Sequence, residues 1–178
     1  MPTSATSPLR FRRLLLTGAA GHLGRELRPR LRARCDRLRL SDRAPIGDLT
    51  DGEEFVRVEL GDADAVRDLV AGVDAIVHLG GVSTEQPWAP ILEANIVGVY
   101  HLYEAARRHG VKRIVFASSN HVTGFSRQDE VVGPKDPVRP DGLYGLSKAF
   151  GENLAQLYWD RWRIETVSLR IGSAFAEP

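Results

Sequence analysis

Short apolar runs alternate with amphipathic segments along almost the whole chain. The apolar runs predict strands at residues 12–17, 37–41, 55–60, 73–79, 111–117 and 164–171. The amphipathic segments predict helices at residues 22–34, 63–71, 87–109 and 143–161, the third being one long helix or two joined ones. We expect Pro29 to kink or shorten the first helix, Asp62 to cap the second and Gly110 to end the third.

The order of these elements indicates the fold class. Strand and helix alternate throughout, and strands that are almost continuously apolar are typical of a parallel sheet covered on both faces. The sequence therefore predicts a doubly wound α/β sheet, and 178 residues suit one domain. We expect that domain at residues 11–178, after a disordered Ser/Thr/Pro-rich tail at residues 1–10. Residues 118–142 are polar, and the length of this segment indicates a functional loop rather than a simple connection between elements.

Composition and charge exclude several kinds of protein. The 24 basic and 23 acidic residues nearly cancel, which argues against a nucleic-acid binder held by overall charge. No apolar run approaches the length of a membrane span. The single cysteine, Cys35, cannot form an internal disulfide, so we expect a reducing compartment, the cytoplasm, and a buried packing role for this thiol. No group of His, Cys and Asp has metal-ligand spacing, so no metal is expected.

A glycine-rich segment follows the first expected strand and opens the first expected helix. Gly18, Gly21 and Gly24 stand where a tight turn would let the backbone approach a pyrophosphate, which the free N–H groups of the helix start then bind. Asp42, at the end of the second strand, would accept hydrogen bonds from an adenosine ribose 2′-hydroxyl and repel a 2′-phosphate. The pattern therefore favours NAD over NADP, although Arg43 would soften the repulsion and Asp42 is also an ordinary strand-end residue.

Two residues of the last expected helix suggest acid–base chemistry. Tyr144 and Lys148 are four positions apart, so their side chains share one helix face. An ammonium beside a phenol, together with a positively charged nicotinamide, would lower the phenol pKa from near 10 towards neutral pH, where a general base works. This spacing also recurs by chance in many helices. Ser119, however, ends the fifth strand, where open α/β sheets bind ligands, and its hydroxyl would hold a substrate alcohol against the tyrosine.

These motifs together resemble a known superfamily. TGAAGHLG (17–24), HLGG (78–81), Asn95, SSN (118–120) and YGLSK (144–148) resemble the extended short-chain dehydrogenases/reductases, also called the NAD-dependent epimerase/dehydratase superfamily. Within it, IVFASSNHVTGF (114–125), RPDGLYGLSKAFGENLA (139–155) and LRIGSAFAEP (169–178) are similar to the uronate dehydrogenases. The resemblance implies a Rossmann-like fold with NAD at the carboxyl edge of its sheet. It also implies oxidation of glucuronate or galacturonate at C1 to the aldarolactone, and a homo-oligomer paired through residues 88–109 and 143–161.

The resemblance also implies a role for individual residues. The catalytic residues would be Ser119, Tyr144 and Lys148. The cofactor would be bound by Gly18, Gly21, His22, Leu23, Gly24, Asp42, Leu60, Leu79, Gly80, Gly81, Asn95 and Lys148. The substrate would be bound by Ser83, Ser119, Asn120, His121, Tyr144 and Ser173. Packing, capping and turn formation are the structural alternatives for Ser83, Asn95 and His121, and His78 is expected to be a buried core imidazole outside the site.

The chain departs from that family in its length. Members continue beyond the sixth strand into a region that covers the substrate, and an arginine that pairs with the substrate carboxylate lies there. The 178 residues therefore support cofactor binding better than full turnover. Two alternatives stay open. One is a nucleotide-sugar epimerase or dehydratase of the same superfamily, which the SSNH segment disfavours. The other is a non-catalytic dinucleotide-binding module, which Ser119, Tyr144 and Lys148 together disfavour.

Overall fold

A computed structural model describes residues 10–174. Its strands are β1 (Phe11–Thr17), β2 (Cys35–Asp42), β3 (Glu53–Arg57), β4 (Ala75–His78), β5 (Arg113–Ser119) and β6 (Glu165–Ile171). Its helices are α1 (His22–Arg32), α2 (Ala63–Val70), α3 (Trp88–Ile91), α4 (Gly98–His109) and α5 (Leu143–Trp162), with a π-helical segment η1 (Leu92–Val97) and a 3₁₀ turn η2 (Asn120–Thr123). The disordered tail expected at residues 1–10 lies outside the described residues except for Arg10.

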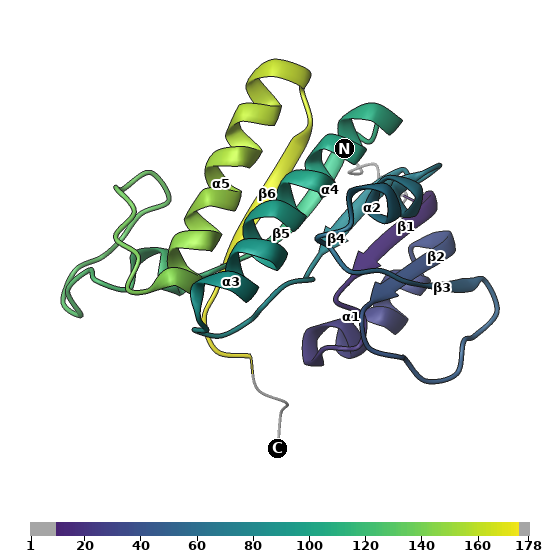
Figure 1. Cartoon of the computed structure of the whole chain (residues 1–178), viewed down its shortest axis with the longest axis horizontal. Coiled ribbons are helices and arrows are strands. Elements are labelled where there is room, and N and C mark those ends of the chain that lie inside the picture. The colour runs from purple at the N-terminus through teal and green to yellow at the C-terminus, as the bar shows by residue number, and fades with distance from the viewer. Residues whose placement is uncertain (1–9, 175–178) are drawn as a thin grey trace, which may run out of the picture.

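All six strands are parallel and lie in the order β3-β2-β1-β4-β5-β6 (Figure 1). The chain builds outwards from β1 to β3, then returns to the other side of β1 and continues to β6. This order is that of a Rossmann fold, so the predicted doubly wound α/β class is confirmed. The loops that leave β1 and β4 diverge at the carboxyl edge, and ligands bind at such a switch point.

Helices cover the two faces of the sheet unequally. On one face α2, α4 and α5 lie side by side (Figure 1) and pack on a core that includes Leu15, Ile76 and Ile114. On the other face α1 covers β1 and β2, where Leu14, Leu16, Leu38 and Leu40 are almost fully buried. On this second face, Val167 and Leu169 of β6 are 56% and 47% exposed.

Several expected element ends are confirmed. The Asp62 carboxylate accepts hydrogen bonds from the backbone N–H groups of Asp64 and Ala65 and caps α2. Gly110 adopts a left-handed conformation, with φ of 72°, and ends α4. Helix α1 continues through Pro29, because the proline falls only one turn from the helix end and removes few backbone hydrogen bonds. The helix ends at Arg32, two residues before its predicted end.

The predicted strands and helices are present, and the bounds of several differ from the prediction by a few residues. Residues 87–109 form joined helices, one of the two predicted arrangements, with η1 between them, a π-helical segment that the apolar spacing did not reveal. Strand β3 occupies residues 53–57 instead of 55–60, since its ladder with β2 starts at Glu53 opposite Leu38. Val58, Glu59 and Leu60 therefore leave the sheet and turn towards its carboxyl edge.

An ion pair ties α1 to β3. Arg28 donates two hydrogen bonds to the Glu53 carboxylate, at 2.9 and 2.6 Å, and the Glu53 side chain is only 2% exposed. These bonds, together with the backbone N–H of Thr50, hold the pKa of Glu53 at about 2, below its ordinary value of 4.5. The contribution of this pair to stability is fully present above pH 4.5 and is lost as the pH falls through 2.

We expect the substitution Glu53→Gln to destabilise the protein at pH 7 by about 3 kcal/mol, the free energy that such a pKa difference represents. The difference from the wild type should shrink as the pH falls from 4.5 towards 2, because protonation then removes the same charge from both proteins. Urea unfolding followed by circular dichroism at a series of pH values measures it. Glu26→Gln, at an exposed position of α1, is the control, and a pH-independent difference would contradict the assignment.

Candidate active site

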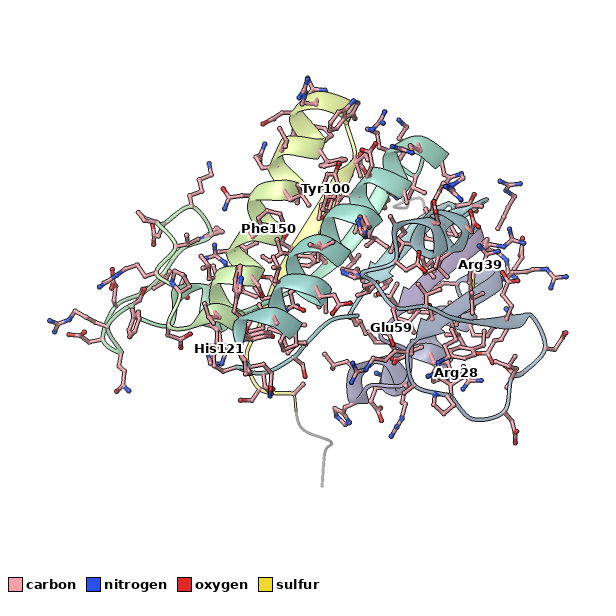
Figure 2. The ribbon with its side chains drawn as sticks, viewed as in Figure 1. Arg28, Arg39, Glu59, Tyr100, His121 and Phe150 are labelled. Carbon is pink, nitrogen blue, oxygen red and sulfur yellow. The ribbon has the colours of Figure 1, made fainter. Side chains whose placement is uncertain are left out.

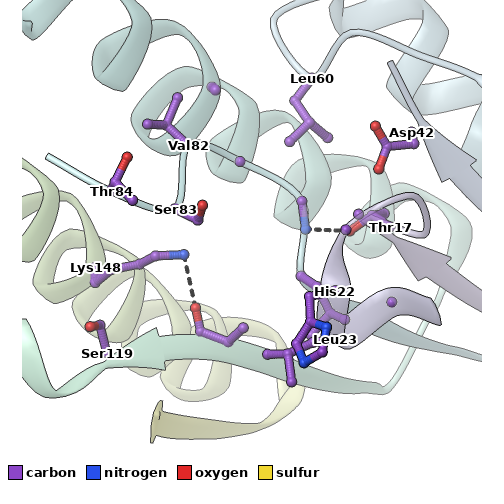
Figure 3. Close-up of a pocket in the computed structure, with 18 of the residues that line it drawn as sticks. Thr17, His22, Leu23, Asp42, Leu60, Val82, Ser83, Thr84, Ser119 and Lys148 are labelled. Carbon is purple, nitrogen blue, oxygen red and sulfur yellow. Dashed lines mark hydrogen bonds between the residues drawn. The ribbon is translucent and has the colours of Figure 1, made fainter. Parts of the chain in front are cut away.

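A cavity of about 990 Å³ opens at the carboxyl edge of the sheet, where the loops after β1, β2, β3, β4, β5 and β6 meet (Figure 3). Nearly all of the site residues expected from the sequence line it. They are Gly18, Gly21, His22, Leu23, Gly24, Asp42, Leu60, Leu79, Gly80, Gly81, Ser83, Ser119, Asn120, His121, Tyr144 and Lys148. Segments far apart in the sequence are thus brought to one surface, as the strand order requires.

The glycine-rich segment forms a tight turn between β1 and α1. Gly18 has φ of 71°, and a Cβ there would lie 2.7 Å from the carbonyl carbon of Leu79 and 2.8 Å from the nitrogen of Gly80. A Cβ on Gly24 would lie 2.2 Å from the carbonyl oxygen of Gly18. Gly21, which precedes α1, is exposed and has no side chain over the helix start. The turn therefore leaves the helix N–H groups accessible to an anion, and it fits a pyrophosphate.

Asp42 connects the glycine-rich turn to the loop after β2. Its carboxylate accepts one hydrogen bond from the backbone N–H of Ala20 at 2.9 Å and another from that of Ala44 at 3.0 Å. Each carboxylate oxygen retains a further lone pair, and the side chain lines the cavity. Asp42 can therefore hold a ribose hydroxyl while it fixes the turn that receives the phosphates.

The loop after β4 is fixed by a buried polar pair. The Thr17 hydroxyl accepts a hydrogen bond from the backbone N–H of Gly80 at 3.1 Å and lies 2.7 Å from Nδ1 of His78. His78 is 1% exposed, and burial, with a smaller effect from the Lys148 charge, lowers its pKa to about 3. The expectation that His78 is a core imidazole outside the cavity agrees with this position.

Ser119, Tyr144 and Lys148 lie together on the β5 and α5 side of the cavity. Ser119 is 4% exposed and Lys148 6% exposed. The Lys148 ammonium donates a hydrogen bond to the carbonyl of Ala117 at 2.9 Å (Figure 3) and lies 5.6 Å from the centre of the Tyr144 ring. The Ser119 hydroxyl is close enough to the Tyr144 phenol to lower its pKa. The helical spacing therefore does place the phenol and the ammonium on the same side of α5.

Burial dominates the electrostatics of this group in the chain alone. Burial raises the pKa of Tyr144 above 10, and the hydrogen bond with Ser119 lowers it by less. Burial also lowers the pKa of Lys148 to about 8. The decrease in the Tyr144 pKa predicted from the sequence needs the charge of a nicotinamide beside the Lys148 ammonium, so it stays a prediction; the ammonium itself donates to the carbonyl of Ala117. Lowering that pKa requires further positive charge at the phenol.

His121 lies at the end of α5 nearest the cavity (Figure 2) and is bound by an acidic partner. Its Nδ1 lies 3.0 and 2.9 Å from the two carboxylate oxygens of Asp141, and its ring meets the Tyr144 ring edge-on at 5.6 Å. The preceding residue, Asn120, accepts a hydrogen bond from the Ser119 hydroxyl at 3.3 Å. The carboxylate holds the imidazole in one orientation, which leaves Nε2 for a ligand. Asp141 has no counterpart among the predicted site residues.

Asn95 and Ser173 are placed differently from the other predicted residues. Neither lines the cavity among residues 10–174, although Ala94, Gly172 and Ala174 do. Asn95 is 2% exposed in η1, where it accepts from the N–H of Val82 at 2.7 Å and donates to the Val82 carbonyl and the Ser147 hydroxyl. A π-helical turn of this kind often marks a functional site, and here it places Asn95 as a brace between the β4 loop and α5.

Several lining residues were not predicted from the sequence. They are Thr17, Ala20, Ser41, Arg43, Ala44, Val58, Glu59, Val82, Thr84, Gln86, Pro90, Ala94, Ala117, Ser118, Ile171, Gly172 and Ala174. Most of them directly flank a predicted site residue or follow the carboxyl end of a strand. That position is the signal that could have found them. Within residues 10–174 no group of three His, Cys, Asp or Glu side chains could hold a metal ion, and no helix is long and apolar enough to cross a bilayer.

The fold and the site define a class of protein, a Rossmann domain that carries a serine, a tyrosine and a lysine beside a cavity at the carboxyl edge of its sheet. Residues 14–178 match the family described as the NAD dependent epimerase/dehydratase family. The chain belongs to this family.

Known proteins similar to the chain include uronate dehydrogenases. The chain is 58% identical to the enzyme of Pseudomonas syringae pv. tomato over 100% of its own length and 65% of that protein. It is 56% identical to the enzyme of Agrobacterium fabrum over 94% of its length and 63% of that protein. The chain thus spans slightly less than two thirds of these relatives.

Solved structures give the same result. The crystal structure of the uronate dehydrogenase from Agrobacterium tumefaciens superposes with a TM-score of 0.92 at 56% identity, over 94% of this chain and 63% of that one. A mutant of that enzyme complexed with NAD superposes with a TM-score of 0.86, over 88% of this chain and 59% of that one. The resemblance noted from the SSNH and YGLSK segments is therefore confirmed.

Proposed function

We propose that the protein is an NAD-dependent dehydrogenase that oxidises a uronic acid, glucuronate or galacturonate, at C1 to the aldarolactone. The observation that carries this proposal is the grouping of Ser119, Tyr144, Lys148 and the His121–Asp141 pair at one end of a cavity. The glycine-rich turn and Asp42 lie at the other end. The identity with uronate dehydrogenases over the whole of this chain supports the substrate class.

In this proposal Tyr144 removes the proton of the anomeric hydroxyl while the C1–H bond breaks and the C1–O double bond forms. NAD, when bound, supplies the acceptor for the hydride and a positive charge that favours the phenolate. Ser119 holds the reacting hydroxyl against the phenol, and Lys148 holds a ribose hydroxyl while its ammonium attracts the phenolate. Asn120 and the imidazole Nε2 of His121 bind other hydroxyls of the sugar.

The other residues of the proposed site divide between the two ligands. Gly18, Gly21, His22, Leu23 and Gly24 would hold the pyrophosphate, whereas Asp42, Leu60, Leu79, Gly80 and Gly81 would hold the adenosine and the central ribose. Ser83 would bind the substrate. Asn95 would not contact the cofactor directly. It would support the site through its hydrogen bonds with the Val82 backbone and with Ser147. Ser173 would bind the substrate from the segment after β6.

The activity is tested by mixing the purified protein with NAD and either uronate and following NADH absorbance. A separate titration measures NAD binding. We expect NADH to form with at least one of the two substrates. Binding of NAD without NADH formation from either would refute the proposed activity and favour a dinucleotide-binding module.

We expect Tyr144→Phe to reduce turnover by at least about 100-fold, the effect of losing a positioned general base. The affinity for NAD should stay within about twofold, because the phenylalanine ring fills the same space and only the proton acceptor is lost. The initial rate of NADH formation and an NAD titration measure the two quantities. A variant that turns over at the wild-type rate would exclude Tyr144 as the base.

We expect Asp42→Asn and Asp42→Ala to narrow the preference for NAD over NADP, because each removes the charge that repels a 2′-phosphate. Asp42→Asn retains an oxygen that can accept from the N–H of Ala20 or Ala44, so it separates the charge from the geometry of the turn. Titrations with both dinucleotides measure the ratio of their dissociation constants. An unchanged ratio in both variants would show that Asp42 does not read the ribose.

We also propose a cytoplasmic homo-oligomer. The buried thiol of Cys35 suits a reducing compartment. Tyr100 of α4, which lies on the near face in Figure 2, and Leu146 and Leu157 of α5 are each about half exposed, and their burial against a second copy would stabilise a paired-helix dimer.

We therefore expect the double substitution Tyr100→Ser with Leu157→Ser to convert a dimer into a monomer, since it removes apolar area from the proposed contact. Size-exclusion chromatography with light scattering gives the mass of each protein. The control is Val131→Ser, at an exposed position away from these helices. A monomeric wild-type protein would end this part of the proposal.

A further inference from the structure

A carboxylate from a distant loop caps the helix that carries Tyr144. Oε1 of Glu85 accepts a hydrogen bond from the backbone N–H of Leu143 at 3.0 Å, and Oε2 accepts one from that of Tyr144 at 2.9 Å. These are the first two N–H groups of α5, which have no partner within the helix. Gly142, which precedes the helix, provides no side-chain cap, and a Cβ there would lie 2.5 Å from Oε2 of Glu85. The glycine thus leaves room for the carboxylate.

The segment that carries Glu85 is fixed to α5 at a second point. Asn95 binds both the N–H and the carbonyl of Val82, at 2.7 and 2.9 Å, and also donates to the Ser147 hydroxyl at 3.0 Å. Ser147 in turn donates to the carbonyl of Tyr144 at 2.7 Å. Residues 82–85 are therefore held at one end by Asn95 and at the other by Glu85.

The residues between these two attachments face the cavity. Ser83 and Thr84 line it, as does Lys148 (Figure 3). The N–H of Tyr144 is bound by Glu85, which belongs to the segment that carries Ser83. Its carbonyl is bound by Ser147, which Asn95 links to Val82 of the same segment. A shift of residues 82–85 would accordingly move Tyr144 with respect to Ser119.

We propose that Glu85 is a positioning residue for Tyr144, which sets the place of the phenol relative to Ser119 and to the substrate contact at Ser83. The inference rests on the proposed function, because it assigns to Glu85 a part in the reaction for which Tyr144 is the base. Glu85 itself does not touch the reacting atoms. Misplacement of a catalytic group by about 1 Å can reduce a rate about 100-fold, so the loss of such a cap has a measurable effect on turnover.

The experiment compares Glu85→Ala and Glu85→Gln with the wild type. We expect Glu85→Ala to lower kcat about 10- to 100-fold and to leave the NAD dissociation constant within about twofold, because the pyrophosphate turn is at the other end of the cavity. Glu85→Gln retains one acceptor oxygen and should recover part of kcat. Glu130→Gln, which removes the same charge from an exposed position of the 118–142 loop, should behave as the wild type.

Three results would overturn the inference. They are an unchanged kcat in Glu85→Ala, an NAD affinity that falls in parallel with kcat, and an equal loss in Glu130→Gln. Circular dichroism shows whether each variant folds. If Glu85→Ala does not fold, Glu85→Gln carries the test, and a wild-type kcat in that variant together with unchanged exchange at the capped amides counts against the inference.

A second readout separates this inference from the proposed function. Backbone amide exchange at Leu143 and Tyr144, measured by NMR, should accelerate in Glu85→Ala while exchange in α4 stays unchanged. If the wild type forms no NADH from either uronate, the proposed function fails and this readout decides whether Glu85 holds Tyr144 in place. Unchanged exchange at both amides would then refute the positioning role.

Discussion

The contact between the backbone of Gly18 and that of Leu79 and Gly80 is the constraint on which the carboxyl edge of the sheet depends. The space between these segments admits no Cβ. The Thr17 hydroxyl fixes this spacing, because it binds the N–H of Gly80 and the imidazole of His78. Because β1 and β4 are neighbours whose loops diverge, this contact joins the turn that suits a pyrophosphate to the loop that leads towards Ser83. Asp42 extends the same arrangement to β2 through the N–H of Ala20.

Burial affects Tyr144 and Lys148 in two opposing ways: it disfavours the charged form of each, and it strengthens the attraction between opposite charges. Withdrawal from water raises the pKa of Tyr144 and lowers that of Lys148, so both groups are held closer to their neutral forms than they would be in solvent. The same poorly solvated surroundings strengthen any interaction between the phenol and a cation. The chain alone thus provides the low-dielectric setting and one ammonium, and the proposed cofactor contributes the remaining charge.

The sequence predicted much of the fold because its signals are local. Continuous apolar runs gave the strands, Asp62 and Gly110 gave helix ends, and the glycine-rich turn with Asp42 gave the binding edge. The spacing of Tyr144 and Lys148 correctly gave their common side of α5. The π-helical segment, the Glu85 cap and the His121–Asp141 pair were missed because each depends on a contact between residues that only the folded chain brings together.

The buried imidazole of His78 has a consequence for how the protein responds to acidity. With a pKa of about 3, it carries no charge at any pH near neutrality. Protonation of the imidazole therefore does not disturb its bond with Thr17, whose hydroxyl also binds Gly80, between weakly acidic and alkaline solution. A pH–rate curve recorded in that interval therefore contains no titration of His78.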